Sequence, residues 1–178
     1  MTIPFARTGA LVLALCAASA VAAQDTPGTP DAKTFATIAA SSNDLEILSS
    51  QLALDTLHDG KTRAFAQQMI DDHTKALQEV QTVAQAKGVT LPTELDAKHK
   101  ATSAKLEKLS GEAFDREYMK VGGVASHKEA HKLLQKNQKS AKDPEVKGLA
   151  TKMMPTVEQH LKAAEQMRTA KSGTTSGK

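Results

Sequence analysis

Apolar positions recur every three or four residues over the first half of the chain, after about residue 30. The first stretch runs from Asp31, a plausible N-cap, to a stop at Asp59-Gly60. Its stripe consists of Phe35, Ile38, Ser42, Leu45, Leu48 or Ser49, and Leu52. A second stretch covers about 61–87, and Gly88 follows it. Its stripe consists of Phe65, Met69, His73, Ala76 or Leu77, Val80 and Ala84. This spacing predicts two amphipathic helices.

The second half of the chain predicts a short helix and two long ones. Leu91-Pro92-Thr93 starts the short helix, which ends near Leu109, and Ser110-Gly111 separates it from a long helix over about 112–140. Gly122-Gly123 lie inside that long helix, and each costs about 1 kcal/mol relative to Ala. We therefore expect either a kink or a very close neighbour at these two residues.

The last helix has the clearest periodicity and a recognisable start. Asp143-Pro144 places an N-cap before a proline at the first helical position, and Pro155 should bend the helix that follows. The stripe consists of Val146, Leu149, Ala150, Met153, Val157, His160, Leu161, Ala164 and Met167. A faint repeat relates the residues after Asp59 to those after Asp143, which favours two similar helical hairpins.

Composition agrees with an all-α fold. The 178 residues include no Trp and only 3% aromatic residues, beside abundant Ala, Leu, Lys, Glu and Gln. We predict an antiparallel four-helix bundle, with an extra short helix before the third long helix. The net charge of +3 is small and its signs are interleaved, which argues against a nucleic-acid partner.

The two ends of the chain differ from the helical part. Residues 1–23 are typical of a signal peptide, with Arg7, the apolar run 11–15 and the small residues Val21-Ala22-Ala23 before the cleavage site. Cys16 would be removed with this leader. We expect a linker at 24–30, the helical domain at 31–170 and a flexible tail at 171–178. The remainder contains no run approaching the ~18 apolar residues of a membrane span, so the sequence predicts a soluble periplasmic protein.

Several short strings resemble an exported bacterial family. They are the run from Phe65 to Thr74, Phe114-Asp115 with Tyr118, Val124 with His127, Met154-Pro155, and His160-Leu161. Their order and spacing over about 34–167 resemble the family catalogued as domain of unknown function 4142. The resemblance implies a ferritin-like fold and a cell-envelope location, since some members are labelled outer membrane proteins. It implies no activity.

The histidines carry the chemistry that the sequence offers. His58 and His99 fall near helix ends or on a polar face, where a solvated side chain is expected. His73 and His160 instead occupy apolar stripes, and His127 and His131 share a face of the long helix because they are four residues apart. With Glu46 at the edge of the first stripe, they form a candidate set of inward metal ligands: Glu46, His73, His127, His131 and His160. Asp72, Asp115 and Glu158 are available to orient the imidazoles.

This set departs from a ferritin-like di-iron site. That site needs Glu three residues before each His, and here Ile70 and Val157 stand in those positions. A looser imidazole site would suit zinc or, with Met69 and Met153 nearby, copper. The alternative is that the histidines are buried polar groups, hydrogen-bonded across helices to Asp72, Glu158 or the backbone.

Motifs for catalysis are missing from the sequence. It contains no serine nucleophile elbow, no Cys-x-x-Cys, no glycine-rich phosphate loop and no convincing pair of catalytic carboxylates, so we expect no enzyme. Two hypotheses follow. The first is a non-catalytic envelope protein that binds a protein partner or responds to stress. The second is a metal-binding bundle for storage or scavenging of a divalent ion.

Overall fold

The computed structural model describes residues 29–56 and 60–175, with side chains described as far as Thr169. His58, Asp59, the expected signal peptide and most of the expected linker lie outside the described residues. The described residues form helices and no strand, which confirms the all-α prediction. The elements are α1 (Pro30–Thr56), α2 (Gly60–Ala86), α3 (Ala97–Leu106), α4 (Gly111–Tyr118), the π-helical η1 (Met119–Ala125), α5 (Ser126–Ser140) and α6 (Pro144–Thr175).

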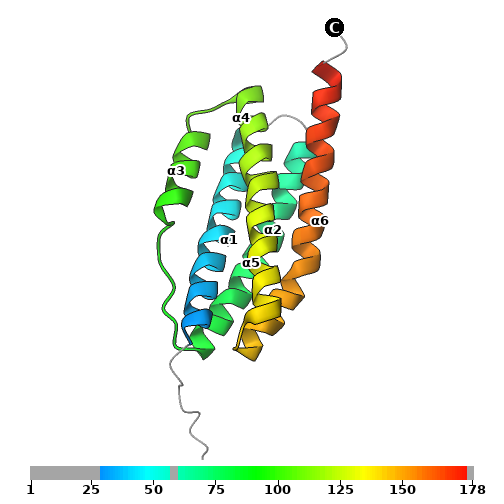
Figure 1. Ribbon diagram of the computed structural model, residues 1–178. Coiled ribbons are helices and arrows are strands. Elements are labelled where there is room, and N and C mark those ends of the chain that lie inside the picture. Colours follow the sequence, from blue (N-terminus) through cyan, green and yellow to red (C-terminus); the bar gives the residue numbers. More distant parts are fainter. Residues whose placement is uncertain (1–28, 57–59, 176–178) are drawn as a thin grey trace, which may run out of the picture.

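Four long helical stretches lie side by side along the molecule (Figure 1). These are α1, α2, the continuous α4–η1–α5 stretch and α6, while α3 lies outside against α1. The colours show that α1 and α2 run in opposite directions, as do α5 and α6. The segment that contains α3 returns the chain along the molecule, so α2 and the α4–η1–α5 stretch run in the same direction.

Two helix boundaries differ from the sequence prediction. The helix expected from Leu91 begins only at Ala97, because the Asp96 side chain accepts a hydrogen bond from the His99 backbone N–H at 2.9 Å and so caps α3. At the other end of the chain, α6 continues to Thr175, beyond the expected start of the tail at residue 171. The expected N-cap of α6 is confirmed, since Asp143 Oδ1 accepts from the Glu145 N–H at 2.9 Å.

The paired glycines of the third long helix lie in its π-helical segment. A Cβ on Gly123 would stand 3.1 Å from the Ala164 Cβ on α6, and one on Gly122 would stand 3.3 Å from the Tyr118 ring. Both distances are shorter than ordinary carbon–carbon contacts. The glycines therefore permit the close approach that the sequence offered as one explanation, and the wider π turn provides the local distortion.

Buried apolar side chains form two clusters at different levels of the molecule. The first apolar cluster includes Phe35, Val80, Leu134 and Val146, and Val157 belongs to it as the periodicity predicted. The second apolar cluster is built around the following side chains: Phe65, Met69, Phe114, Tyr118, Met119 and Ala164. On every long stretch at least one polar residue of the core stands between the residues of the two clusters. We call these residues the polar layer: Asn43 and Glu46 on α1, His73 on α2, His127 on α5 and His160 on α6.

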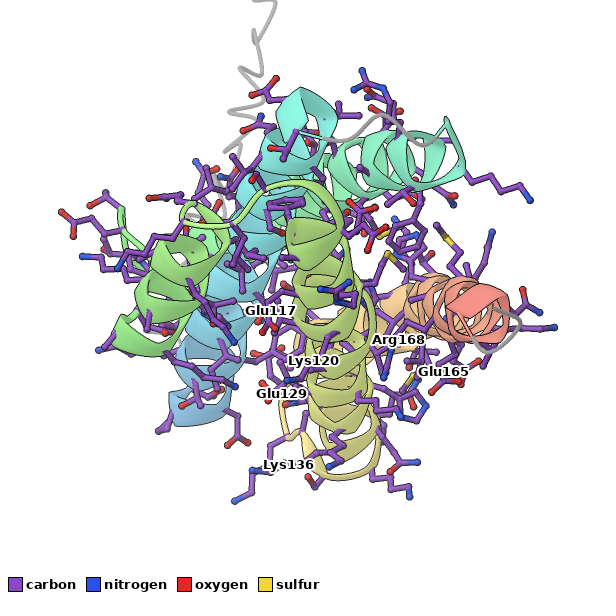
Figure 2. The ribbon with its side chains drawn as sticks, turned by 90° about the horizontal axis from the view of Figure 1, so that it is seen from above. Glu117, Lys120, Glu129, Lys136, Glu165 and Arg168 are labelled. Carbon is purple, nitrogen blue, oxygen red and sulfur yellow. The ribbon has the colours of Figure 1, made fainter. Side chains whose placement is uncertain are left out.

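Charged side chains surround this core. Figure 2 shows Glu117, Lys120, Glu129 and Lys136 along the α4–η1–α5 stretch, and Glu165 and Arg168 on α6. Both signs alternate along these surfaces, in agreement with the interleaving read from the sequence. Among the described residues, no helix is long and apolar enough to cross a membrane.

Candidate metal centre

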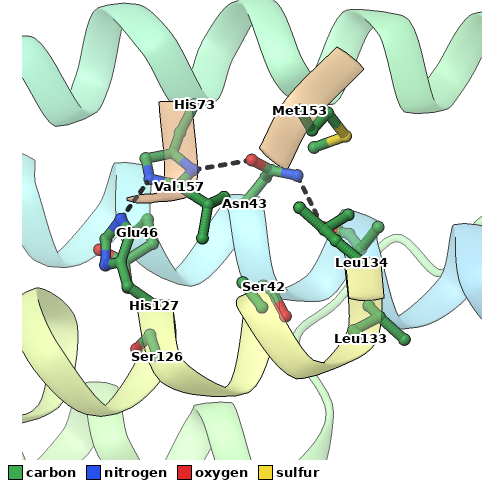
Figure 3. A pocket seen from close by; sticks show the side chains of 12 residues that line it. Ser42, Asn43, Glu46, His73, Ser126, His127, Leu133, Leu134, Met153 and Val157 are labelled. Atoms are coloured by element: carbon green, nitrogen blue, oxygen red, sulfur yellow. Dashed lines mark hydrogen bonds between the residues drawn. The ribbon is translucent and has the colours of Figure 1, made fainter. Parts of the chain in front are cut away.

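Three imidazoles from three different helices converge in the polar layer. His73 Nε2 lies 3.4 Å from His127 Nε2, and His127 Nε2 lies 3.3 Å from His160 Nδ1. All three of these nitrogens lie within 4.8 Å of one another. The His127 and His160 side chains are buried, and His73 is nearly so (Figure 3 shows His73 and His127). We call His73, His127 and His160 the histidine triad, and the three nitrogens that face one another its inner nitrogens.

The outer nitrogen of each ring faces a hydrogen-bond acceptor. His73 Nδ1 lies 2.8 Å from Asn43 Oδ1, His127 Nδ1 lies 2.9 Å from the Gly122 carbonyl, and His160 Nε2 lies 3.0 Å from Asp72 Oδ2. The Asn43 amide is itself oriented, because its Nδ2 donates to the Ala39 carbonyl at 2.8 Å. A neutral imidazole carries one proton, and these acceptors place it on the outer nitrogen. Each inner nitrogen is therefore left with a lone pair.

Electrostatics keep the triad neutral. Burial lowers the pKa of His73 well below its usual range, and repulsion from His127 and His160 lowers it further. Burial, together with His160, lowers the pKa of His127 to about 4. Burial also lowers the pKa of His160, although the Asp72 carboxylate opposes that shift. At neutral pH the inner nitrogens are thus three acceptors facing one another without a proton between them.

This arrangement has the chemistry of a metal site. Neutral imidazole is a ligand for zinc and copper, and a hydrogen-bonded outer nitrogen is the usual means by which proteins orient such a ligand. A tetrahedral ion with metal–nitrogen bonds of about 2.0–2.1 Å would separate two ligand nitrogens by about 3.3 Å. The two shorter distances in the triad, 3.3 and 3.4 Å, are close to that value.

Glu46 borders the triad from α1. Its side chain is buried, and neither carboxylate oxygen has a hydrogen-bond partner among the described residues. Burial raises the pKa of the Glu46 carboxyl to about 8, and the nearby Ser126 hydroxyl opposes the rise only in part. That hydroxyl donates to the Val121 carbonyl at 2.7 Å. Glu46, His73 and His127 line one small cavity of about 40 Å³ (Figure 3).

A second cavity reaches the triad from another side. It has a volume of about 180 Å³ and is lined by residues of α2 and α6, including Asp72, His73 and His160. Met153 lines both cavities, each of which is also lined by residues of the triad. Lys152 and Glu79 also line the second cavity and form an ion pair of 2.7 Å between α6 and α2.

The structure brings together three of the five sequence-predicted ligands. Glu46 stands beside the triad, while His131 lies outside it, with its Nε2 3.4 Å from Glu158 Oε1 and its side chain 31% exposed. The polar layer is about one helical turn deep, and His131 follows His127 by a full turn. Of the predicted orienting carboxylates, Asp72 contacts His160 and Glu158 contacts His131.

Other expectations about polar residues need correction. His99 was expected to be solvated but is only 8% exposed, because α3 packs its N-terminal turn against α1. Its Nδ1 lies 2.9 Å from both Ser41 Oγ and Asp96 Oδ2. Sequence reasoning also missed Asn43 and the Gly122 carbonyl as orienting groups. Asn43 carried a usable signal, since it stands three residues before Glu46 and so shares its helical face.

The fold and the site of the described residues thus define a class of protein: an all-helical protein with a cluster of three imidazoles in its interior. The chain belongs to the family described as "Domain of unknown function (DUF4142)", whose model matches residues 17–167. No curated protein matches the chain.

Two solved structures resemble the fold. One is a DUF305 fragment from Deinococcus radiodurans, with a TM-score of 0.70 and 16% sequence identity, covering 79% of this chain and 97% of that one. The other is CopM in the Cu(I)-bound form, with a TM-score of 0.63 and 16% identity, covering 78% of this chain and 96% of that one. At this level of identity the similarity concerns the fold alone.

Proposed function

We propose that the protein binds a transition-metal ion through the inner nitrogens of His73, His127 and His160. One observation carries the proposal: each outer nitrogen has its own acceptor, so three lone pairs converge in a buried site. The inner nitrogens lie within hydrogen-bond distance of one another, but with each proton on an outer nitrogen none of them has a proton to donate. Buried acceptors without a donor are rare in native structures, and a bound cation would satisfy all three at once.

The alternative, a purely structural triad, explains less. Contacts to Asn43, Gly122 and Asp72 would tie the helices together as that hypothesis requires. They use only the outer nitrogens, however. A structural role alone leaves the inner nitrogens turned toward one another, and it does not explain why two of the three distances among them match metal–ligand spacing.

Zinc and copper are the ions to test first. Imidazole accepts both, and a thioether such as that of Met153 favours copper. The Cu(I)-bound form of CopM, a protein of similar fold, supports including Cu⁺ among the candidates. The fold similarity transfers no ligand from that protein to this one.

The proposal also includes the location of the protein, its type of role and its fold type. The leader-like residues 1–23 support export to the periplasm. The absence of a catalytic motif from the sequence supports storage or scavenging rather than catalysis. We regard the four long stretches with the added α3 as a four-helix bundle of ferritin-like type. It lacks the Glu-x-x-His pairs of di-iron proteins, since Ile70 and Val157 occupy their positions.

Metal-dependent thermal stability tests the proposal. A ligand that binds only the folded state adds about 2.7 kcal/mol of stability at a hundredfold excess over its Kd. We expect Zn²⁺ or copper to raise the Tm of the metal-free protein at pH 7, and His160→Ala to abolish the rise. His99→Ala is the control and should keep it, because His99 stands apart from the triad. If Zn²⁺, Cu⁺, Cu²⁺, Mn²⁺ and Fe²⁺ all leave the wild-type Tm unchanged, the metal-binding proposal is wrong.

A further inference from the structure

Glu46 is a buried carboxylate that the rest of the structure does not explain. It is 2% exposed, both of its oxygens lack a hydrogen-bond partner among the described residues, and it lines the same cavity as His73 and His127. A fully buried carboxyl group without a hydrogen-bond partner is rare in native structures, so such a group usually serves a ligand or a reaction. Its position on the triad's cavity indicates a ligand.

The space around this carboxylate is also unusual. The cavity of about 40 Å³ that Glu46, His73 and His127 line exceeds the roughly 10–15 Å³ that one water molecule needs, so it has room for an ion or a water beside these side chains. Gly122 also lies beside this carboxylate, since a Cβ there would stand 3.5 Å from Glu46 Oε2, an ordinary contact distance. The residue that supplies the acceptor for His127 is thus a neighbour of Glu46 as well.

Charge distinguishes the ions that this site would hold. The three neutral imidazoles contribute no charge, and Asp72, bonded to His160, contributes one negative charge. Lys75 approaches the other Asp72 oxygen at 3.9 Å, but its side chain is 73% exposed and therefore solvated. A monovalent ion is balanced by Asp72 alone. A divalent ion leaves one positive charge in a buried site, which is costly unless a second anion is near.

We propose that Glu46 is this second anion when an ion is bound, so that the polar layer suits a divalent ion such as Zn²⁺ or Cu²⁺ rather than Cu⁺. The three histidines offer ligand nitrogens within 4.8 Å of one another, and Glu46 stands beside that group and not within it. This inference rests on the proposed function and adds the charge of the ion and the fourth group. Carboxylate beside imidazole is a ligand combination that divalent zinc accepts. Met153, the thioether that would favour Cu⁺, is then a neighbour of the site and not the residue that selects the ion.

Glu46→Gln tests the inference, because it keeps the size of the side chain and removes the charge. Calorimetric titration of the metal-free protein with Zn²⁺, and separately with Cu⁺ under anaerobic reducing conditions, measures the two affinities. We expect Glu46→Gln to weaken Zn²⁺ binding at least about tenfold and to change Cu⁺ binding less than about threefold. Glu46→Asp, which keeps the anion, should retain more Zn²⁺ affinity than Glu46→Gln.

Glu158→Gln is the matched control, because it removes a carboxylate that contacts His131 outside the triad. It should change neither affinity more than about threefold. An unchanged Zn²⁺ affinity in Glu46→Gln, or equal losses for Zn²⁺ and Cu⁺, would overturn the role of Glu46. In either case the proposed function would stand if His160→Ala still abolished binding. A wild-type protein that bound neither ion would refute the proposed function itself.

Discussion

The histidine triad and His99 are two buried histidine environments that use their ring nitrogens differently. His99 joins α3 to α1, with its Nδ1 2.9 Å from Ser41 Oγ and 2.9 Å from Asp96 Oδ2. Asp96 also caps α3 through the His99 backbone N–H, so ring, cap and helix contact form one local unit. In the triad, by contrast, hydrogen bonds to other groups engage the outer nitrogens, and the inner nitrogens meet only each other.

Burial alone therefore does not distinguish the histidines of the candidate metal centre from His99. His99 is 8% exposed and His160 is 1% exposed, yet the bonded nitrogen of His99 meets a hydroxyl and a carboxylate. What distinguishes the triad is the direction of its free lone pairs. The three inner nitrogens are acceptors that no donor faces, and they lie 3.3 and 3.4 Å apart along the two shorter edges of the triad. A proton or a metal ion could bind to them.

Of the tests of this comparison, we expect low pH to have the largest effect, because the neutral triad makes the folded state less stable in acid. The triad has lowered pKa values when folded, whereas the unfolded chain has histidine pKa values near 6.5. The unfolded state therefore binds more protons, and the free energy of unfolding should fall as pH decreases from about 6.5 toward 4. For His127, whose folded pKa is about 4, the loss is on the order of 3 kcal/mol. Urea unfolding of the metal-free protein across this range measures it, and a flat profile would contradict a neutral triad.

Glu46 should act in the opposite direction at higher pH. Its folded pKa of about 8 exceeds the ordinary value of 4.5, so the folded state binds the extra proton between these values. Its contribution to stability is fully present below about pH 4.5 and is lost as pH rises through 8. Glu46→Gln should remove the decline between pH 6.5 and 8 while leaving the acid limb in place. If the decline persists in this variant, another group causes it.

His99→Ala should have a smaller effect that does not depend on metal. The substitution removes the contacts to Ser41 and Asp96 and leaves Ser41 in a buried position. We expect a loss of about 1–2 kcal/mol in the free energy of unfolding, of equal size with and without Zn²⁺. Chemical denaturation in both conditions measures it. A loss that appears only with Zn²⁺ would mean that His99 takes part in binding the ion.

The sequence predicted the helices and two histidines of the triad for the same physical reason. A histidine on an apolar stripe must face the core, which predicted the inward positions of His73 and His160. For His127 the sequence predicted only a helical face shared with His131. The cap at Asp143 and the close approach at Gly123 were also readable, because each depends on local chemistry. Local sequence patterns were thus enough to predict the features that depend on the residues of a single helix.

The remaining features depend on contacts between helices. The burial of His99 follows from a helix that begins at Ala97, where Asp96 is the N-cap, whereas Leu91-Pro92-Thr93 indicated an earlier start. The Gly122 carbonyl is a backbone group, so no side-chain pattern could mark it as the acceptor for His127. His131 could not be separated from the triad without knowing how deep the polar layer is. That depth is known only once the positions of the two apolar clusters are known.

His131→Ala should have the smallest effect, and it tests where the site ends. The sequence treats His127 and His131 alike, but His131 is 31% exposed on its side chain and contacts a Glu158 side chain that is 57% exposed. Such surface pairs contribute little to stability, so we expect a change below about 0.5 kcal/mol in the free energy of unfolding. The Zn²⁺ affinity should stay within about twofold of wild type, because one helical turn, roughly 5 Å, separates His131 from the level of His127. Calorimetric titration provides the measurement, with His160→Ala as the variant that loses binding. A tenfold loss in His131→Ala would place His131 among the ligands, and the site would then extend beyond the polar layer toward the first apolar cluster.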